Sequence, residues 1–106
     1  MKFNAHLTAF TDGQVRQVEV PNMECSGTTN SILENIYLYG QNEVSPMENR
    51  RSVSPGDAIE YHGKFYMILL VGFTEITKNN LEEFKKLSLP NKIKYLMEME
   101  NKSEKI

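Results

Sequence analysis

The sequence predicts an α+β domain: an antiparallel sheet of about four strands, formed by two hairpins, with one short central helix and two C-terminal helices. Two pairs of segments with alternating apolar residues flank turn-forming residues, which is the pattern of a β-hairpin. Three other segments carry apolar residues at helical spacing. A chain of 106 residues has the size of one domain. We expect this domain to span residues 1–100, with 101–106 as a flexible polar tail.

The first predicted hairpin is N-terminal. Alternate positions of residues 2–10 are apolar, as in a half-buried strand. Residues 11–14 place Asp-Gly at the centre of a turn, and residues 15–20 form the returning strand. Pro21 ends this strand because proline has no N–H to donate to a neighbouring strand.

Residues 31–39 form the predicted central helix. Asn30 or Ser31 can cap its N-terminus, and Ser31 with Glu34 matches a capping box. Gly40 is the predicted C-cap, because glycine readily ends a helix.

The second hairpin has the clearest turn signals. Ser-Pro-Gly-Asp at 54–57 matches a type II turn, in which proline fixes φ and glycine accepts a positive φ. Strands 58–61 and 64–71 are then joined by the two-residue loop His-Gly at 62–63. Strand 64–71 is apolar on both faces, so we expect it to be central and covered on both sides. The loop length predicts the pairs Tyr61 with Lys64 and Ile59 with Tyr66.

Two amphipathic helices are predicted after Phe73, which should turn back into the core. Asn79 or Asn80 can cap the first helix, and Glu82 with Lys86 would form an i,i+4 ion pair. A Ser-Leu-Pro break at 88–90 separates the helices, and its proline suits the first turn of the second. The second helix has an apolar stripe that would pack on the sheet or contact a partner or a second copy: Ile93, Leu96, Met97 and Glu100.

The composition favours a cytoplasmic protein. No apolar run approaches the ~20 residues that span a membrane, and no basic start precedes an apolar block as in a signal peptide. The single cysteine, Cys25, allows no internal disulfide, which fits a reducing cytoplasm. We expect an ordinary loop or buried thiol, because no motif links Cys25 to His6 or His62. We predict no metal and no cofactor, since two histidines and one cysteine are too few ligands.

The charges are unevenly distributed along the chain, although the formal net charge is only −2. Residues 17–49 contain five glutamates and no lysine or arginine, whereas residues 78–106 contain seven lysines and five glutamates. An ordinary solvated surface would account for this, and so would an acidic face that meets a basic partner. On the second interpretation, we predict a partner-binding surface that comprises Glu34, Glu43, Glu48, Arg50 and Arg51.

The pair Arg50-Arg51 ends the polar loop 41–51 and has two interpretations. Arg51 can bond a carboxylate such as Asp57, or the two guanidinium groups can bind a phosphate or carboxylate of a partner. A further possibility is an acid–base set of Asp57, His62 and Arg51, which would need a common pocket. Because His62 is expected at an exposed hairpin tip, we predict no catalytic residues and no enzymatic activity.

Residues 51–57 (Arg-Ser-Val-Ser-x-Gly-Asp), 63–66 (Gly-Lys-Phe-Tyr) and 72–75 (Gly-Phe-x-Glu) resemble a pattern found in small proteins of phages and integrative elements. The pattern is similar to that of the YodL-like domains, in which R-S-x-S-x-(G/S)-D and Y-x-x-x-x-G-F recur. The match covers about residues 33–76. That family has no established activity, so the resemblance implies a mobile-element origin and no mechanism.

Together these features predict a small phage or mobile-element protein that binds and inhibits a host protein. The most concrete version is an antidefence inhibitor of a CRISPR nuclease or a restriction enzyme, whose acidic face competes with nucleic acid for a basic groove. The alternative is a nucleic-acid-binding accessory or regulatory protein that uses the arginine pair and the C-terminal lysines. We expect no direct membrane contact, and either a monomer or a homodimer.

Overall fold

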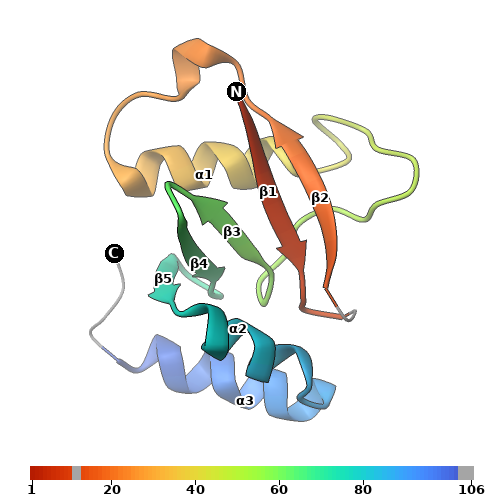
Figure 1. The fold of residues 1–106 in the computed structure, drawn as a ribbon, viewed down its shortest axis with the longest axis vertical. Helices are drawn as coiled ribbons and strands as arrows, with labels where there is room; N and C mark the ends of the chain where they lie inside the picture. Colours follow the sequence, from red (N-terminus) through yellow and green to blue (C-terminus); the bar gives the residue numbers. More distant parts are fainter. Residues whose placement is uncertain (11–12, 103–106) are drawn as a thin grey trace.

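The computed structural model describes residues 1–10 and 13–102, and its centre is an antiparallel sheet of five strands in the order β2-β1-β3-β4-β5 (Figure 1). The strands are β1 (Lys2–Leu7), β2 (Gln14–Glu19), β3 (Ala58–Tyr61), β4 (Lys64–Ile68) and β5 (Phe73–Ile76). The predicted α+β class is therefore confirmed, with one strand more than expected. The additional strand, β5, pairs with β4 and occupies the edge of the sheet.

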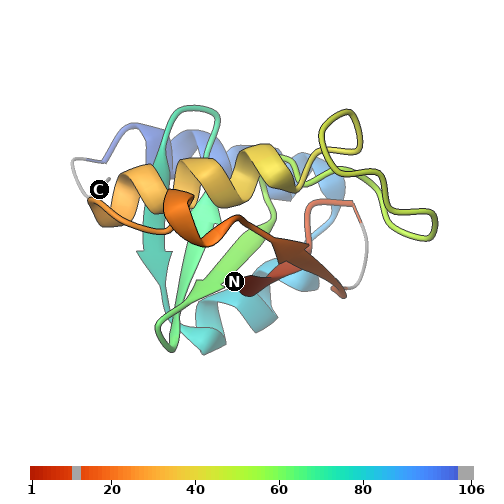
Figure 2. The same ribbon diagram turned by 90° about the horizontal axis from the view of Figure 1, so that it is seen from above.

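Helices cover both faces of the sheet (Figures 1 and 2). The helix α1 (Thr29–Tyr39) packs on one face, and α2 (Lys78–Lys85) and α3 (Leu89–Glu100) pack on the other. A short 3-10 helix, η1 (Asn22–Glu24), precedes α1. Among the described residues, no helix is long and apolar enough to span a membrane.

Each layer of helices has its own apolar core. The larger core joins alternate residues of the strands to α1 through Ile32, Leu33 and Ile36. The smaller core joins the opposite face of β3 and β4 to Leu81, Phe84 and Leu96 of α2 and α3. Strand β4 contributes to both cores, which explains why it is apolar on both faces and confirms that it is covered on both sides.

The N-terminal hairpin forms as predicted, with β1 antiparallel to β2 from Lys2↔Glu19 to Leu7↔Gln14. However, β1 ends at Leu7 rather than at residue 10. The reason is that the chain leaves the ladder at Thr8, whose hydroxyl donates to the carbonyl oxygen of Gly56 (2.6 Å). The predicted turn at 11–14 includes residues 11 and 12, which lie outside the described residues.

The second hairpin follows the prediction closely in its turns. In the type II turn, Gly56 has φ of +94° and Asp57 N–H donates to Ser54 O (3.0 Å). In the hairpin loop, His62 and Gly63 have φ of 50° and 75°, as a type I′ turn requires. The two predicted residue pairs, which involve Tyr61 and Ile59 of β3, are both confirmed.

Strand β4 ends at Ile68, three residues earlier than predicted. Leu69 N–H donates to Gly72 O (2.9 Å), so residues 69–72 form a tight turn instead of a continued strand. Leu70 and Val71 are consequently exposed rather than buried on alternate faces of the sheet. Phe73 returns to the core, as expected, and begins β5.

Both predicted capping assignments were wrong by a few residues. Helix α1 is capped by Thr28, whose hydroxyl oxygen accepts a hydrogen bond from Ser31 N–H (3.1 Å), so the proposed Ser31 capping box does not form. Helix α2 is capped by Thr77 in a capping box with Asn80. Several adjacent residues can act as caps in both places, and the sequence does not distinguish them.

Other local predictions had mixed outcomes. Gly40 is the C-cap of α1, and Pro90 lies in the first turn of α3, both as predicted. Glu82 pairs with Lys85 (3.0 Å) rather than with Lys86, and this ion pair lowers the pKa of Glu82.

The predicted stripe of α3 is only partly buried. Leu96 lies in the core as expected, and Lys92 is buried beside it, with its ammonium donating to Thr8 O (2.7 Å). Ile93 and Met97, however, are 50% and 55% exposed. The helix therefore packs through a face that is rotated from the predicted one.

Candidate functional site

The most distinctive surface of the described chain lies on α1 and the loop that follows it. Glu34 is exposed on α1, and Glu43 and Glu48 are exposed in the loop of residues 41–52. None of the three forms an ion pair within residues 1–10 and 13–102. Each glutamate has an exposed apolar neighbour. Leu38 lies one helical turn after Glu34, Val44 follows Glu43, and Met47 precedes Glu48. We call these six residues the α1–loop surface.

The loop of residues 41–52 is held in place by Arg16 of β2. Arg16 is 1% exposed, and its guanidinium donates to Asn42 Oδ1 (2.8 Å), Ser45 O (2.7 Å) and Arg51 O (2.9 Å). Burial lowers the pKa of Arg16. The loop extends beyond β2 in both views (Figures 1 and 2), and the hydrogen bonds of Arg16 hold its base against the strand.

Asn42 organises the interior of the same loop. Its side-chain amide donates to Arg50 O (3.1 Å), and its Oδ1 accepts from Met47 N–H (3.2 Å). Its own backbone N–H donates to the hydroxyl of Ser52 (2.8 Å). The loop is therefore ordered by several internal hydrogen bonds, although its sequence shows neither helical nor strand periodicity.

Arg51 is engaged in the fold, which confirms the interpretation that it bonds Asp57. Its Nη1 and Nη2 donate to Asp57 Oδ2 and Oδ1, both at 2.7 Å. Asp57 is fully buried and also accepts from the backbone N–H groups of Ala9 (2.9 Å) and Ser54 (2.8 Å). A phosphate could bind the guanidinium of Arg51 only by displacing the carboxylate of Asp57.

Arg50, which is half-buried like Arg51, is also bonded to the fold. Its Nε donates to Val15 O (3.0 Å), and its Nη1 donates to Asn49 O (2.8 Å). The two neighbouring arginines therefore point to different partners and do not form one common anion site.

The structure separates the residues of the possible acid–base set. Asp57 immediately precedes β3, whereas His62 immediately follows it, so the two lie at opposite ends of the strand. His62 is exposed, with its ring edge against Tyr61 (4.2 Å between centroids). The sulfur of Cys25 donates to the carbonyl oxygens of Val20 (3.8 Å) and Pro21 (3.4 Å), and the side chain packs against the larger core. Within the described ranges, no three His, Cys, Asp or Glu residues form a group that could hold a metal ion.

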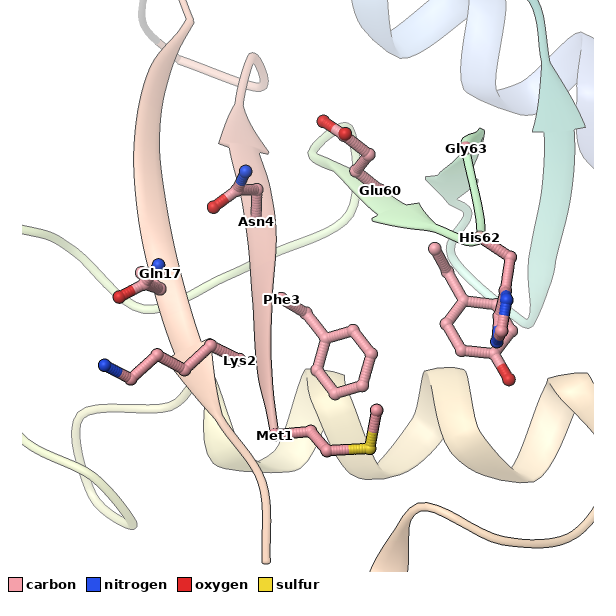
Figure 3. A pocket seen from close by; sticks show the side chains of 9 residues that line it. Met1, Lys2, Phe3, Asn4, Gln17, Glu60, His62 and Gly63 are labelled. Carbon is pink, nitrogen blue, oxygen red and sulfur yellow. The ribbon is translucent and has the colours of Figure 1, made fainter. Parts of the chain in front are cut away.

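A hollow of about 320 Å³ lies between β1 and the β3–β4 hairpin (Figure 3). Phe3 points from β1 towards the hairpin turn (Figure 3), and Glu60 Oε1 lies 2.9 Å from His6 Nε2. No local sequence pattern indicates this hollow, because it depends on the pairing of β1 with β3, which are distant in sequence. It is lined by Met1, Lys2, Phe3, Asn4, Gln17, Glu60, Tyr61, His62 and Gly63.

The chain is a small α+β protein that exposes glutamates and apolar side chains on its α1–loop surface. Comparisons with protein-family models, curated proteins and solved structures find no match for this chain. The resemblance to YodL-like domains therefore stays a prediction, and function must be argued from the surface itself.

Proposed function

We propose that this chain is a small non-enzymatic protein of a phage or mobile element that binds a basic surface of a cytoplasmic host protein. In its most concrete form it is an antidefence inhibitor that competes with nucleic acid for a groove of a CRISPR nuclease or a restriction enzyme. The α1–loop surface makes the contact.

The observation that carries the proposal is the unpaired charge of this surface. Residues 17–49 supply η1, α1 and most of the following loop, and they contain five glutamates without a lysine or arginine. Lysines are instead concentrated in α2 and α3, which cover the opposite face of the sheet. The chain therefore has an acidic side that would be attracted to a basic partner.

The apolar neighbours favour a protein partner over simple charge mimicry. Leu38 is 50% exposed one turn from Glu34, and Val44 and Met47 accompany the two loop glutamates. Protein interfaces combine such apolar contacts with a polar rim, and electrostatic complementarity contributes mainly to specificity and association rate. The hydrogen bonds of Arg16 limit the loss of conformational freedom that a loop would otherwise suffer on binding.

The proposal is tested with the variant E34K/E43K/E48K. The matched control is E75K/E82K/E83K, which changes the net charge equally through exposed glutamates of β5 and α2. Tagged wild type and both variants are incubated with lysate of the host, and captured proteins are identified by mass spectrometry. Each captured protein is then assayed for nucleic-acid binding with and without the wild-type chain.

We expect wild type and control to capture a nucleic-acid-binding protein that the acidic-surface variant does not capture. The purified chain should also displace nucleic acid from that protein. Capture that survives reversal of all three glutamates would refute the assigned surface. Recovery of only nuclease-sensitive nucleic acid, with a steep salt dependence, would instead support the alternative of a nucleic-acid-binding protein.

A further inference from the structure

A second surface lies on the opposite layer, along α3. Leu89, Ile93 and Met97 follow one another at four-residue spacing and are 48%, 50% and 55% exposed. We call these three residues the α3 stripe. Leu89 and Ile93 also border an apolar groove of about 280 Å³, together with Phe10 and Leu70.

The α3 stripe is not the side of the helix that packs on the sheet. That side is formed by Lys92 and Leu96, which are buried, with Tyr95 and Met99 packed beside them. At about 100° per residue, the stripe lies roughly a quarter-turn away from this buried side. Phe10 and Leu70 are themselves 64% and 62% exposed, so the apolar surface continues beyond the helix. Monomeric proteins seldom leave such a continuous apolar surface open to water.

The charges beside the stripe indicate what covers it. Lys94 and Glu98 are exposed, one residue after Ile93 and Met97 respectively, and so flank the stripe on its solvent side. Neither forms an ion pair within the described part of the chain. A positive charge thus flanks the middle of the stripe, and a negative charge flanks its C-terminal end.

This arrangement is complementary to itself in an antiparallel pair. If a twofold axis passes between Ile93 and Met97, Lys94 of one copy lies about 3 Å along the helix axis from Glu98 of the other. Both residues are on the same flank, and the axis repeats the contact on the second copy. A parallel twofold pair would instead place the two copies of Lys94, and likewise of Glu98, on opposite flanks of the interface, so that neither charge would face its complement. We propose that a second copy of this chain covers the α3 stripe, in a twofold antiparallel homodimer.

The dimer is compatible with the function proposed above but does not depend on it. Helix α1 lies on the other face of the sheet from α3, so both copies keep their α1–loop surface free. A dimer would present two such surfaces and could bind a repeated or twofold partner with increased avidity.

The test is the mass of the full chain in solution, measured by sedimentation equilibrium over a wide concentration range. We expect a wild-type mass of twice the 12.2 kDa of one chain. I93E should raise the dissociation constant at least about tenfold, because a charge replaces a buried apolar contact. The matched control is L38E, since Leu38 is equally exposed (50%) but lies on α1. Circular dichroism confirms that each variant is folded.

Charge reversal tests the antiparallel register. K94E and E98K should each weaken the dimer, because each places like charges opposite each other in both symmetric contacts. A mixture of the two variants should form a heterodimer more readily than either forms a homodimer, and K94E/E98K should recover self-association. A wild-type monomer at hundreds of micromolar would overturn the proposal. A dimer that I93E and both charge reversals leave unchanged would overturn it equally.

Discussion

The carboxylate of Asp57 is the part of the fold whose removal should be most damaging. It is fully buried and accepts four short hydrogen bonds, two from Arg51 and one each from the backbone of Ala9 and Ser54. D57N keeps the shape of the side chain but replaces one acceptor oxygen with an NH₂ group. This NH₂ group would face N–H donors of Arg51 or of the backbone. The substitution also leaves the Arg51 guanidinium without its counter-charge.

The magnitude can be worked out from these contacts. Hydrogen bonds to charged groups contribute about 1.5–3 kcal/mol each, and breaking a buried ion pair costs about 3–5 kcal/mol. The side chain of Arg51 is 28% exposed, so water can replace part of what the guanidinium loses. We therefore expect D57N to lower the free energy of unfolding by about 3 kcal/mol, from a total of about 5–15 kcal/mol for a domain of this kind.

The measurement is urea unfolding followed by far-ultraviolet circular dichroism, since the chain has no tryptophan. With an m-value of about 1.5 kcal/mol/M, the midpoint should fall by about 2 M urea. The control is E75Q, because Glu75 is a half-exposed carboxylate that pairs with Lys64 at 3.6 Å. Such surface pairs contribute about 0–1 kcal/mol. A D57N midpoint equal to that of E75Q would refute the structural role assigned to Asp57.

Two further predictions concern the end of α1. In G40A, the added Cβ would lie 2.6 Å from Val53 Cγ2, and we expect such overpacking to lower the free energy of unfolding by about 1–3 kcal/mol. The added substitution V53A should restore part of this loss in the same urea assay, and no recovery would contradict the steric explanation. Hydrogen bonding to Glu24 raises the pKa of Tyr39. The neutral phenol therefore stabilises the folded state at pH values below the unfolded pKa of about 10, and this contribution is lost as the pH rises through the folded pKa. In an alkaline absorbance titration, E24Q should shift one tyrosine to lower pH, and an unchanged curve would contradict this assignment.

Local signals made the second hairpin predictable in detail. The Pro-Gly and His-Gly turns each require particular φ values, and the two-residue loop fixes the register of the strands. The end of β4 was not predictable in this way. Leu70 and Val71 favour a strand by composition, but the turn closed by Leu69 and Gly72 redirects the chain into β5.

The burial of Arg16 could have been predicted from the alternation of residues along β2. Arg16 alternates with Val18 on β2 and with Val20 directly after the strand, so the strand period alone places it on the core-facing side. Its acceptors in the loop of residues 41–52 are 26 to 35 residues away in sequence, and no local pattern could have identified them. For the same reason, the sequence indicated that Glu34, Glu43 and Glu48 are exposed but not what supports them.

Three cations of the chain bond groups within the fold. Arg16 bonds the loop, Arg51 bonds Asp57, and Lys92 bonds Thr8 O, so these three positive charges stabilise the scaffold instead of neutralising surface glutamates. Because charges separated by more than about 8–10 Å are screened at physiological salt, the exposed glutamates act on a partner only at close range. Binding through this surface should consequently require shape and apolar complementarity as well as charge, which Leu38 and its apolar neighbours can supply.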